Sequence, residues 1–133
     1  MNLNIRPEQV ETVAMTVNPL AKQKPITTAD GSAIRSILDS TNAPVVRQSL
    51  AEAQLPAKGE TQRHYHRQSE ELYFIIQGEA TMEIDGELRK VLPGDGILIP
   101  AGAWHQIRAS EGAPLQFLCC CAPPYSHEDT FFE

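Results

Sequence analysis

The chain has 133 residues, of which 41% are hydrophobic and 21% are charged. These values are typical of one globular domain with a real core and not of a disordered chain. The 17 acidic residues outnumber the 11 Lys and Arg residues and give a formal net charge of -6. Because nucleic acids and anionic lipids bind clustered positive charge, we expect neither as a partner.

Targeting signals and cysteine usage indicate the compartment. No apolar run approaches the roughly 20 residues that span a bilayer, so we expect no membrane association. The first residues lack a basic start followed by an apolar stretch, so we also expect no signal peptide. The three cysteines are consecutive, at Cys119, Cys120 and Cys121. An odd, clustered set is not a disulfide framework, and it suits the reducing cytoplasm.

Residues 1–44 differ from the rest of the chain. We expect them to form an extension that packs on the main domain or on a partner. Alternating residues over 11–17 predict a short strand. Apolar residues at helical spacing over 33–38, after the turn residues Asp30 and Gly31, predict a short helix.

Residues 45–122 alternate between short apolar runs and turns. Asp85-Gly86 is a strong hairpin signal, because Gly accepts a positive φ there. Many short strands with frequent turns predict an all-β sandwich or barrel. We expect regular structure to stop at Pro123, leaving residues 123–133 as a tail with a solvated His127. This tail could fold over the mouth of a barrel or across a partner. The expected strands cover residues 48–55, 62–66, 71–77, 81–84, 87–92, 97–99, 104–108 and 115–121.

Three histidines and one glutamate in the β region form a candidate metal site. His64 and His66 are separated by one residue, so on a strand both imidazoles point to the same face. Glu71 opens the next strand, and His105 follows a Pro-x-Gly turn. A His-x-His pair alone is a weak signal. Three imidazoles with one carboxylate nevertheless form a donor set for Fe, Mn, Ni, Co, Zn or Cu rather than for Ca or Mg.

The surrounding glycines make the pattern more specific. Gly59 precedes the histidine pair by four residues, and Gly78 follows Glu71 after six residues.

A second block precedes the last histidine of the pattern. It runs from Gly94 through Pro100 and Gly102 to His105. Together, the two blocks make residues 45–121 resemble the cupin superfamily, in particular its small single-domain members. The family pattern usually has five residues before the histidine pair, and it closes on an Asn where this chain has Ala109. It also has six residues between its glutamate and its glycine, so the resemblance favours Glu71 over Glu70 as the ligand and implies that Glu70 points out of the barrel.

The resemblance implies a double-stranded β-helix, which is a barrel of the jelly-roll type. It implies one divalent transition metal per chain, bound by His64, His66, Glu71 and His105. Four protein ligands would leave positions open for water, a small-molecule substrate or dioxygen. Small cupins also suggest a homodimer in which the N-terminal strand pairs across the interface.

Alternation along the strands adds neighbours of the site. Gln62 and Tyr73 share faces with the ligands, and as buried polar groups they would contact a substrate or a metal-bound water. Ile75, Ile107 and Phe117 are interpreted as ordinary core. If Phe117 points inward, Cys119 could line the pocket too.

Other side chains should point away from the interior. Leu72, Phe74 and Ile76 alternate with the ligand face and form an outward apolar surface that must be covered. Arg63, Arg67 and Arg108 flank the ligands but also alternate away from the cavity.

Fold alone does not set the function. The first hypothesis is an oxidoreductase resembling cupin dioxygenases that act on enols, flavonols or thiol-bearing substrates. The second is a redox-free isomerase, cyclase or lyase in which the metal acts as a Lewis acid. The third is a small-ligand-binding cupin without catalysis.

Overall fold

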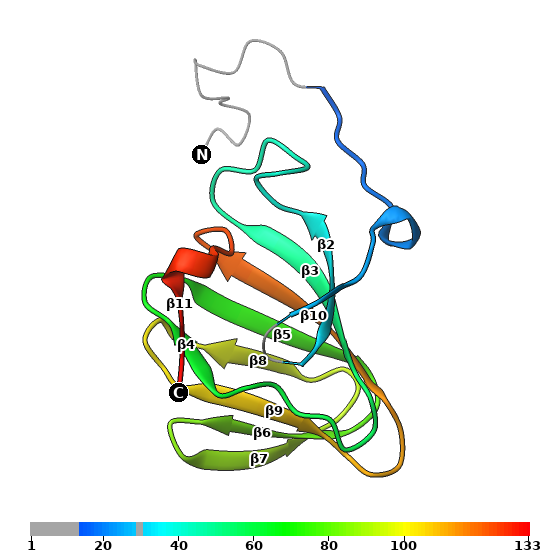
Figure 1. Cartoon of the computed structure of the whole chain (residues 1–133), viewed down its shortest axis with the longest axis vertical. Helices are drawn as coiled ribbons and strands as arrows, with labels where there is room; N and C mark the ends of the chain where they lie inside the picture. Colours follow the sequence, from blue (N-terminus) through cyan, green and yellow to red (C-terminus); the bar gives the residue numbers. More distant parts are fainter. Residues whose placement is uncertain (1–13, 29–30) are drawn as a thin grey trace, which may run out of the picture.

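The computed structural model describes residues 14–28 and 31–133, and the fold is built almost entirely from strands (Figure 1). Within these residues, no helix is long and apolar enough to cross a membrane. The two short 3-10 helices are η1 (Leu20–Lys22) and η2 (His127–Asp129). The strands are β1 (Ile26–Thr27), β2 (Ala33–Leu38), β3 (Ser49–Leu55), β4 (His64–His66), β5 (Glu70–Gln77), β6 (Ala80–Ile84), β7 (Glu87–Val91), β8 (Gly96–Ile99), β9 (His105–Ala109), β10 (Leu115–Ala122) and β11 (Thr130–Phe132).

The strands form two antiparallel sheets. One sheet has six strands in the order β1-β2-β3-β10-β5-β8, and the other has five in the order β11-β4-β9-β6-β7. Inward-facing side chains of both sheets make one core, in which Ile75, Ile107 and Phe117 are at most 1% exposed. The predicted all-β jelly roll is therefore confirmed, and so is the interpretation of these three residues as core.

Two glycines fix turns that the sequence signals. Asp85 and Gly86 have φ values of 47° and 91° and join β6 to β7, which confirms the predicted hairpin. Gly78 ends β5 with a φ of 86°. A Cβ at this position would clash with the carbonyl oxygen of Pro114, so a larger residue could not stand there.

The helix predicted over 33–38 is wrong, because these residues form β2. This strand pairs with β3 on one side and with β1 on the other. Ile34 packs against the core from β2. A six-residue helix is too short to be stable by itself, whereas the open edge of β3 offers a row of backbone partners. Residues 14–17 form no strand, and the rest of the strand expected over 11–17 lies outside the described residues.

The C-terminal tail is more ordered than the sequence suggests. After Pro123 the chain returns as β11, which pairs with β4. Phe131 stacks on Tyr65 with ring centroids 5.1 Å apart, and Phe132 lies 5.6 Å from His64. These aromatic contacts anchor a segment that carries no strand pattern of its own. His127 is exposed, as expected.

The outward face of β5 is apolar, as its alternation predicts. Leu72, Phe74 and Ile76 are 49%, 48% and 41% exposed. Leu98 on β8 lies directly beside Leu72 in the sheet and is 54% exposed. We call these four residues the outer apolar face.

Candidate metal centre

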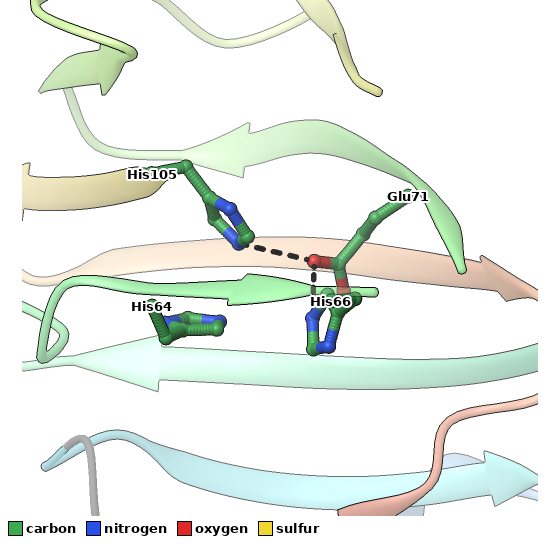
Figure 2. Close-up of side chains that lie close together, drawn as sticks. All are labelled: His64, His66, Glu71 and His105. Atoms are coloured by element: carbon green, nitrogen blue, oxygen red, sulfur yellow. Dashed lines mark hydrogen bonds and ion pairs between the residues drawn. The ribbon is translucent and has the colours of Figure 1, made fainter. Parts of the chain in front are cut away.

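Four side chains from three strands meet between the two sheets (Figure 2). His64 and His66 come from β4, Glu71 from β5 and His105 from the first position of β9. One ligand atom from each residue lies within 4.8 Å of the others, and all four side chains are buried. The structure thus brings together the four residues that the sequence predicts as ligands.

Strand geometry explains how residues so far apart in sequence converge. Alternation along β4 turns both histidines inward and leaves Tyr65 between them to pack against Trp104, with ring centroids 4.7 Å apart. His64 is the direct neighbour of His105 in the sheet. Glu71 is buried whereas Glu70 is exposed, as predicted for this pair.

Backbone carbonyls set the tautomer of two histidines. Nδ1 of His64 lies 2.8 Å from the carbonyl oxygen of Gln62, and Nδ1 of His105 lies 3.0 Å from that of Ala103. A carbonyl oxygen only accepts hydrogen bonds, so each Nδ1 carries the proton. Each Nε2 then keeps a lone pair for the centre of the site.

A threonine in the C-terminal strand sets the tautomer of the third histidine. Nδ1 of His66 lies 3.1 Å from Oγ1 of Thr130, and this hydroxyl donates to the carbonyl oxygen of Ser126 at 2.9 Å. Because a hydroxyl has a single hydrogen, Thr130 must accept from Nδ1–H of His66. All three imidazoles therefore carry a proton on Nδ1, which leaves Nε2 as the nitrogen that can bind a metal.

The arrangement of these atoms fits a metal ion. Nε2 of His66 and of His105 lie 3.2 and 3.4 Å from Oε1 of Glu71 (dashed in Figure 2). Nε2 of His105 is buried and has no hydrogen-bond partner among the described residues. Lone pairs of nitrogen and oxygen face one another here, so a positive charge, either a proton or a metal ion, must lie among them. Three nitrogens and one oxygen are donors that suit a transition metal.

Electrostatics keeps two of these groups in the form that binds a metal. Burial raises the pKa of Glu71, but its contacts with His105 and His66 outweigh burial and hold the pKa well below the ordinary value of 4.5. Burial, together with repulsion from His105, lowers the pKa of His64 below its ordinary value of 6.5. At neutral pH, Glu71 is therefore a carboxylate and His64 a neutral imidazole, as metal binding requires.

Cys121 contacts the same carboxylate. Its Sγ lies 3.1 Å from Oε2 of Glu71, and both side chains are buried. Burial and the negative charge of Glu71 raise the pKa of the Cys121 thiol far above its ordinary value of 9.0. The thiol therefore stays protonated and donates to Oε2. Sequence reasoning did not single out this residue, although alternation along β10 places it on the face of Phe117.

The two predicted neighbours of the site have different outcomes. Tyr73 is buried, with its ring centroid 6.2 Å from that of His105 and 4.6 Å from that of Phe117. The prediction that Gln62 faces the cavity is wrong, because its side chain is exposed and its Nε2 donates to the carbonyl oxygen of Glu133 at 3.4 Å. β4 begins only at His64, so its alternation does not extend to residue 62.

The arginines beside the ligands point outward, as predicted. Arg67 and Arg108 are exposed, and Arg67 lies over the ring of Phe131. The guanidinium of Arg63 pairs with Glu83 and with Glu133. None of these three arginines therefore directs its cationic group toward the four-residue cluster.

A pocket of about 570 Å³ opens between the edge strands β7 and β8. It is lined by apolar side chains that include Ile84 and Ile97, with Arg89 and Lys90 also on its wall. None of the four cluster residues lines it. Ile84 is the sheet neighbour of His105, and Ile97 is that of Tyr73, so the pocket ends one residue from the centre.

Comparison with known proteins identifies the family. Residues 51–121 match the family model of the cupin domain. The chain belongs to the cupin family. It is similar to an uncharacterized protein of Methanocaldococcus jannaschii, with 47% identity over 109 residues, which is 82% of this chain and 87% of that protein.

Solved cupin structures share the fold. Pac13 of Streptomyces, described as a nucleoside dehydratase, has a TM-score of 0.76 at 11% identity, covering 90% of this chain and 92% of that chain. The polyketide cyclase RemF of Streptomyces resistomycificus has a TM-score of 0.72 at 22% identity, covering 87% and 89%. At such low identities the likeness shows the fold alone.

Proposed function

We propose that this cupin is a metal-dependent oxidoreductase of the dioxygenase type that acts on a small molecule. The observation that carries the proposal is the convergence of three imidazole nitrogens and one carboxylate oxygen, all within 4.8 Å of one another, in the barrel interior. The metal is one divalent ion per chain, drawn from Fe, Mn, Ni, Co, Zn and Cu, whose order of affinity does not by itself select one.

The chain's own residues have distinct roles in this proposal. His64, His66 and His105 would hold the ion through their imidazoles, and Glu71 would hold it through its carboxylate. When bound, the ion supplies Lewis-acid and redox chemistry. The ring of Tyr73 packs beside His105, and in this proposal Tyr73 contributes to the wall of the substrate site. In this proposal the small substrate enters from the pocket between β7 and β8, whose wall carries both apolar and charged side chains.

A second candidate is a redox-free reaction, either cyclisation or elimination. The names of the two solved neighbours, a nucleoside dehydratase and a polyketide cyclase, favour it. A phosphorylated sugar is less well supported as a substrate. Arg67 and Arg108 are exposed, and the cations on the pocket wall, Arg89 and Lys90, already pair with Glu87 and Glu79.

Oxygen dependence separates the two reactions. Metal-free protein is loaded anaerobically with each of the six ions, and enols, flavonols, thiols, polyketides and nucleosides are then offered with and without dioxygen. A dioxygenase consumes one dioxygen per substrate with a redox-active ion only. Turnover that is unchanged without dioxygen would overturn the first candidate and establish the second. Binding without any turnover would contradict both and leave a ligand-binding cupin.

We propose that a second copy of the chain covers the outer apolar face. Leu72, Phe74, Ile76 and Leu98 are all uncharged and lie together on paired strands. Two copies related by a twofold axis can bury this face against itself without burying a charged side chain, even though each copy has a net charge of -6.

We also propose a reducing compartment, the cytoplasm, for this protein. None of Cys119, Cys120 and Cys121 forms a disulfide bond in the structure. Adjacent cysteines persist without a disulfide where the surroundings keep them reduced.

A further inference from the structure

Cys121 has no role in the function proposed above, yet it contacts one of the four cluster residues. We propose that Cys121 is a positioning residue, whose thiol holds Oε2 of Glu71 so that Oε1 alone is presented to the three imidazoles. This inference rests on the metal-binding part of the proposed function.

The register of the sheet builds this contact. Glu71 on β5 and Cys121 on β10 are direct cross-strand partners, so their side chains leave the sheet on the same face. The thiol reaches Oε2 at 3.1 Å, while Oε1 lies 3.2 Å from His66 and 3.4 Å from His105. The two oxygens of one carboxylate therefore have different partners.

Removing the donor would remove this distinction. Among the described residues, the Cys121 thiol is the hydrogen-bond partner of Oε2. A carboxylate without it can rotate about its terminal bond and offer either oxygen, or both, to an ion. Outer partners of metal ligands set orientation in this way, and their loss typically costs about 10- to 100-fold in metal affinity.

The competing explanation is that sulfur itself binds the ion. The donor atoms that converge within 4.8 Å come from the three histidines and Glu71 and do not include Sγ of Cys121. A donor role and a ligand role predict opposite results for serine, because a hydroxyl still donates a hydrogen bond but is a poor substitute for a thiolate ligand.

The test compares Cys121→Ser, Cys121→Val and Cys121→Ala in the full chain. Apparent affinities for Zn²⁺ and Co²⁺ are measured by competition with a chromophoric chelator, and the visible spectrum of the Co²⁺ form is recorded. We expect Cys121→Val and Cys121→Ala to bind about 10- to 100-fold more weakly with an altered cobalt spectrum. Cys121→Ser should restore both properties. Cys120→Ala, on the outward face of β10, is the matched control and should leave both unchanged.

Three results would overturn the inference. Valine and alanine variants with wild-type affinity and spectrum would show that Cys121 only fills space. A serine variant that binds metal as weakly as the valine variant, together with a sulfur-to-cobalt charge-transfer band in the wild type, would show that the thiol is itself a metal ligand. A wild type that binds neither of these ions, nor any of the other four candidate ions, would refute the proposed function itself, and this inference with it. Should valine prevent folding, the serine–alanine comparison decides alone.

Discussion

The hydroxyl of Thr130 ties the C-terminal strand to the candidate metal centre, because it lies 3.1 Å from Nδ1 of His66. The same hydroxyl donates to the carbonyl oxygen of Ser126. One residue of the tail therefore fixes which nitrogen of His66 is free, although 64 positions separate the two residues. The tail is part of the site rather than an appendage to it.

Thr130→Val should weaken metal binding by about 10-fold or more, because the isosteric side chain cannot accept the hydrogen bond from Nδ1 of His66. The measurement is chelator competition with Zn²⁺. Thr81→Val on the exposed side of β6 is the control and should have no effect. Equal affinities for Thr130→Val and the wild type would show that the tail does not orient His66.

The two adjacent glutamates should behave differently. Glu71→Gln replaces a buried carboxylate by a neutral amide and should cost more than the ~10- to 100-fold typical of outer partners of metal ligands. Glu70→Gln alters an exposed side chain and should leave the affinity within error. If both substitutions, or neither, abolished binding in the same titration, the assignment of Glu71 would be wrong.

His64 should make the metal-free protein less stable in acid. Burial is the first cause that lowers its folded pKa below 6.5, so the unfolded chain binds a proton that the folded chain does not. The stability that the folded protein gains from a neutral His64 is fully present above pH 6.5. Below pH 6.5 this contribution to the free energy of unfolding decreases by up to ~1.4 kcal/mol per pH unit, until the pH reaches the folded pKa of His64. His64→Gln should reduce this pH dependence in urea titrations of the metal-free protein. If the free energy of unfolding varied with pH equally in the wild type and in His64→Gln, this role of His64 would be refuted.

The outer apolar face should hold two copies together. Light scattering after size exclusion should give twice the chain mass for the wild type and the chain mass for Phe74→Glu combined with Leu98→Glu. Leu88→Glu introduces one such negative charge at a residue that is 67% exposed on β7, in the other sheet, and should remain dimeric. A monomeric wild type, or a dimeric double variant, would refute the proposal that a second copy covers the outer apolar face.

The positions of the metal-site residues could be predicted because strand alternation and turn chemistry are local. The shared face of His64 and His66 follows from the period of two along a strand. The choice of Glu71 over Glu70 follows from the spacing to Gly78 in the pattern that the chain shares with the cupins. The Asp85-Gly86 hairpin follows from the need for positive φ. Each of these signals depends only on near neighbours in the chain.

The errors arose where long-range pairing overrides the local pattern. Residues 33–38 have apolar spacing that suits a helix, yet the open edge of β3 makes them a strand. Gln62 lies before the first residue of β4, so the alternation of β4 does not extend to it. Neither Thr130 nor Cys121 could be linked to the site without the register of β11 on β4 and of β10 on β5.

The most direct test of the metal centre is its stoichiometry. Protein purified from its own host, and metal-free protein reloaded with each candidate ion, are analysed for bound metal per chain. We predict one ion per wild-type chain, and loss of most of it in His64→Ala and in His105→Ala. Unchanged stoichiometry in both variants, or a wild type that retains no ion under any loading, would contradict the account.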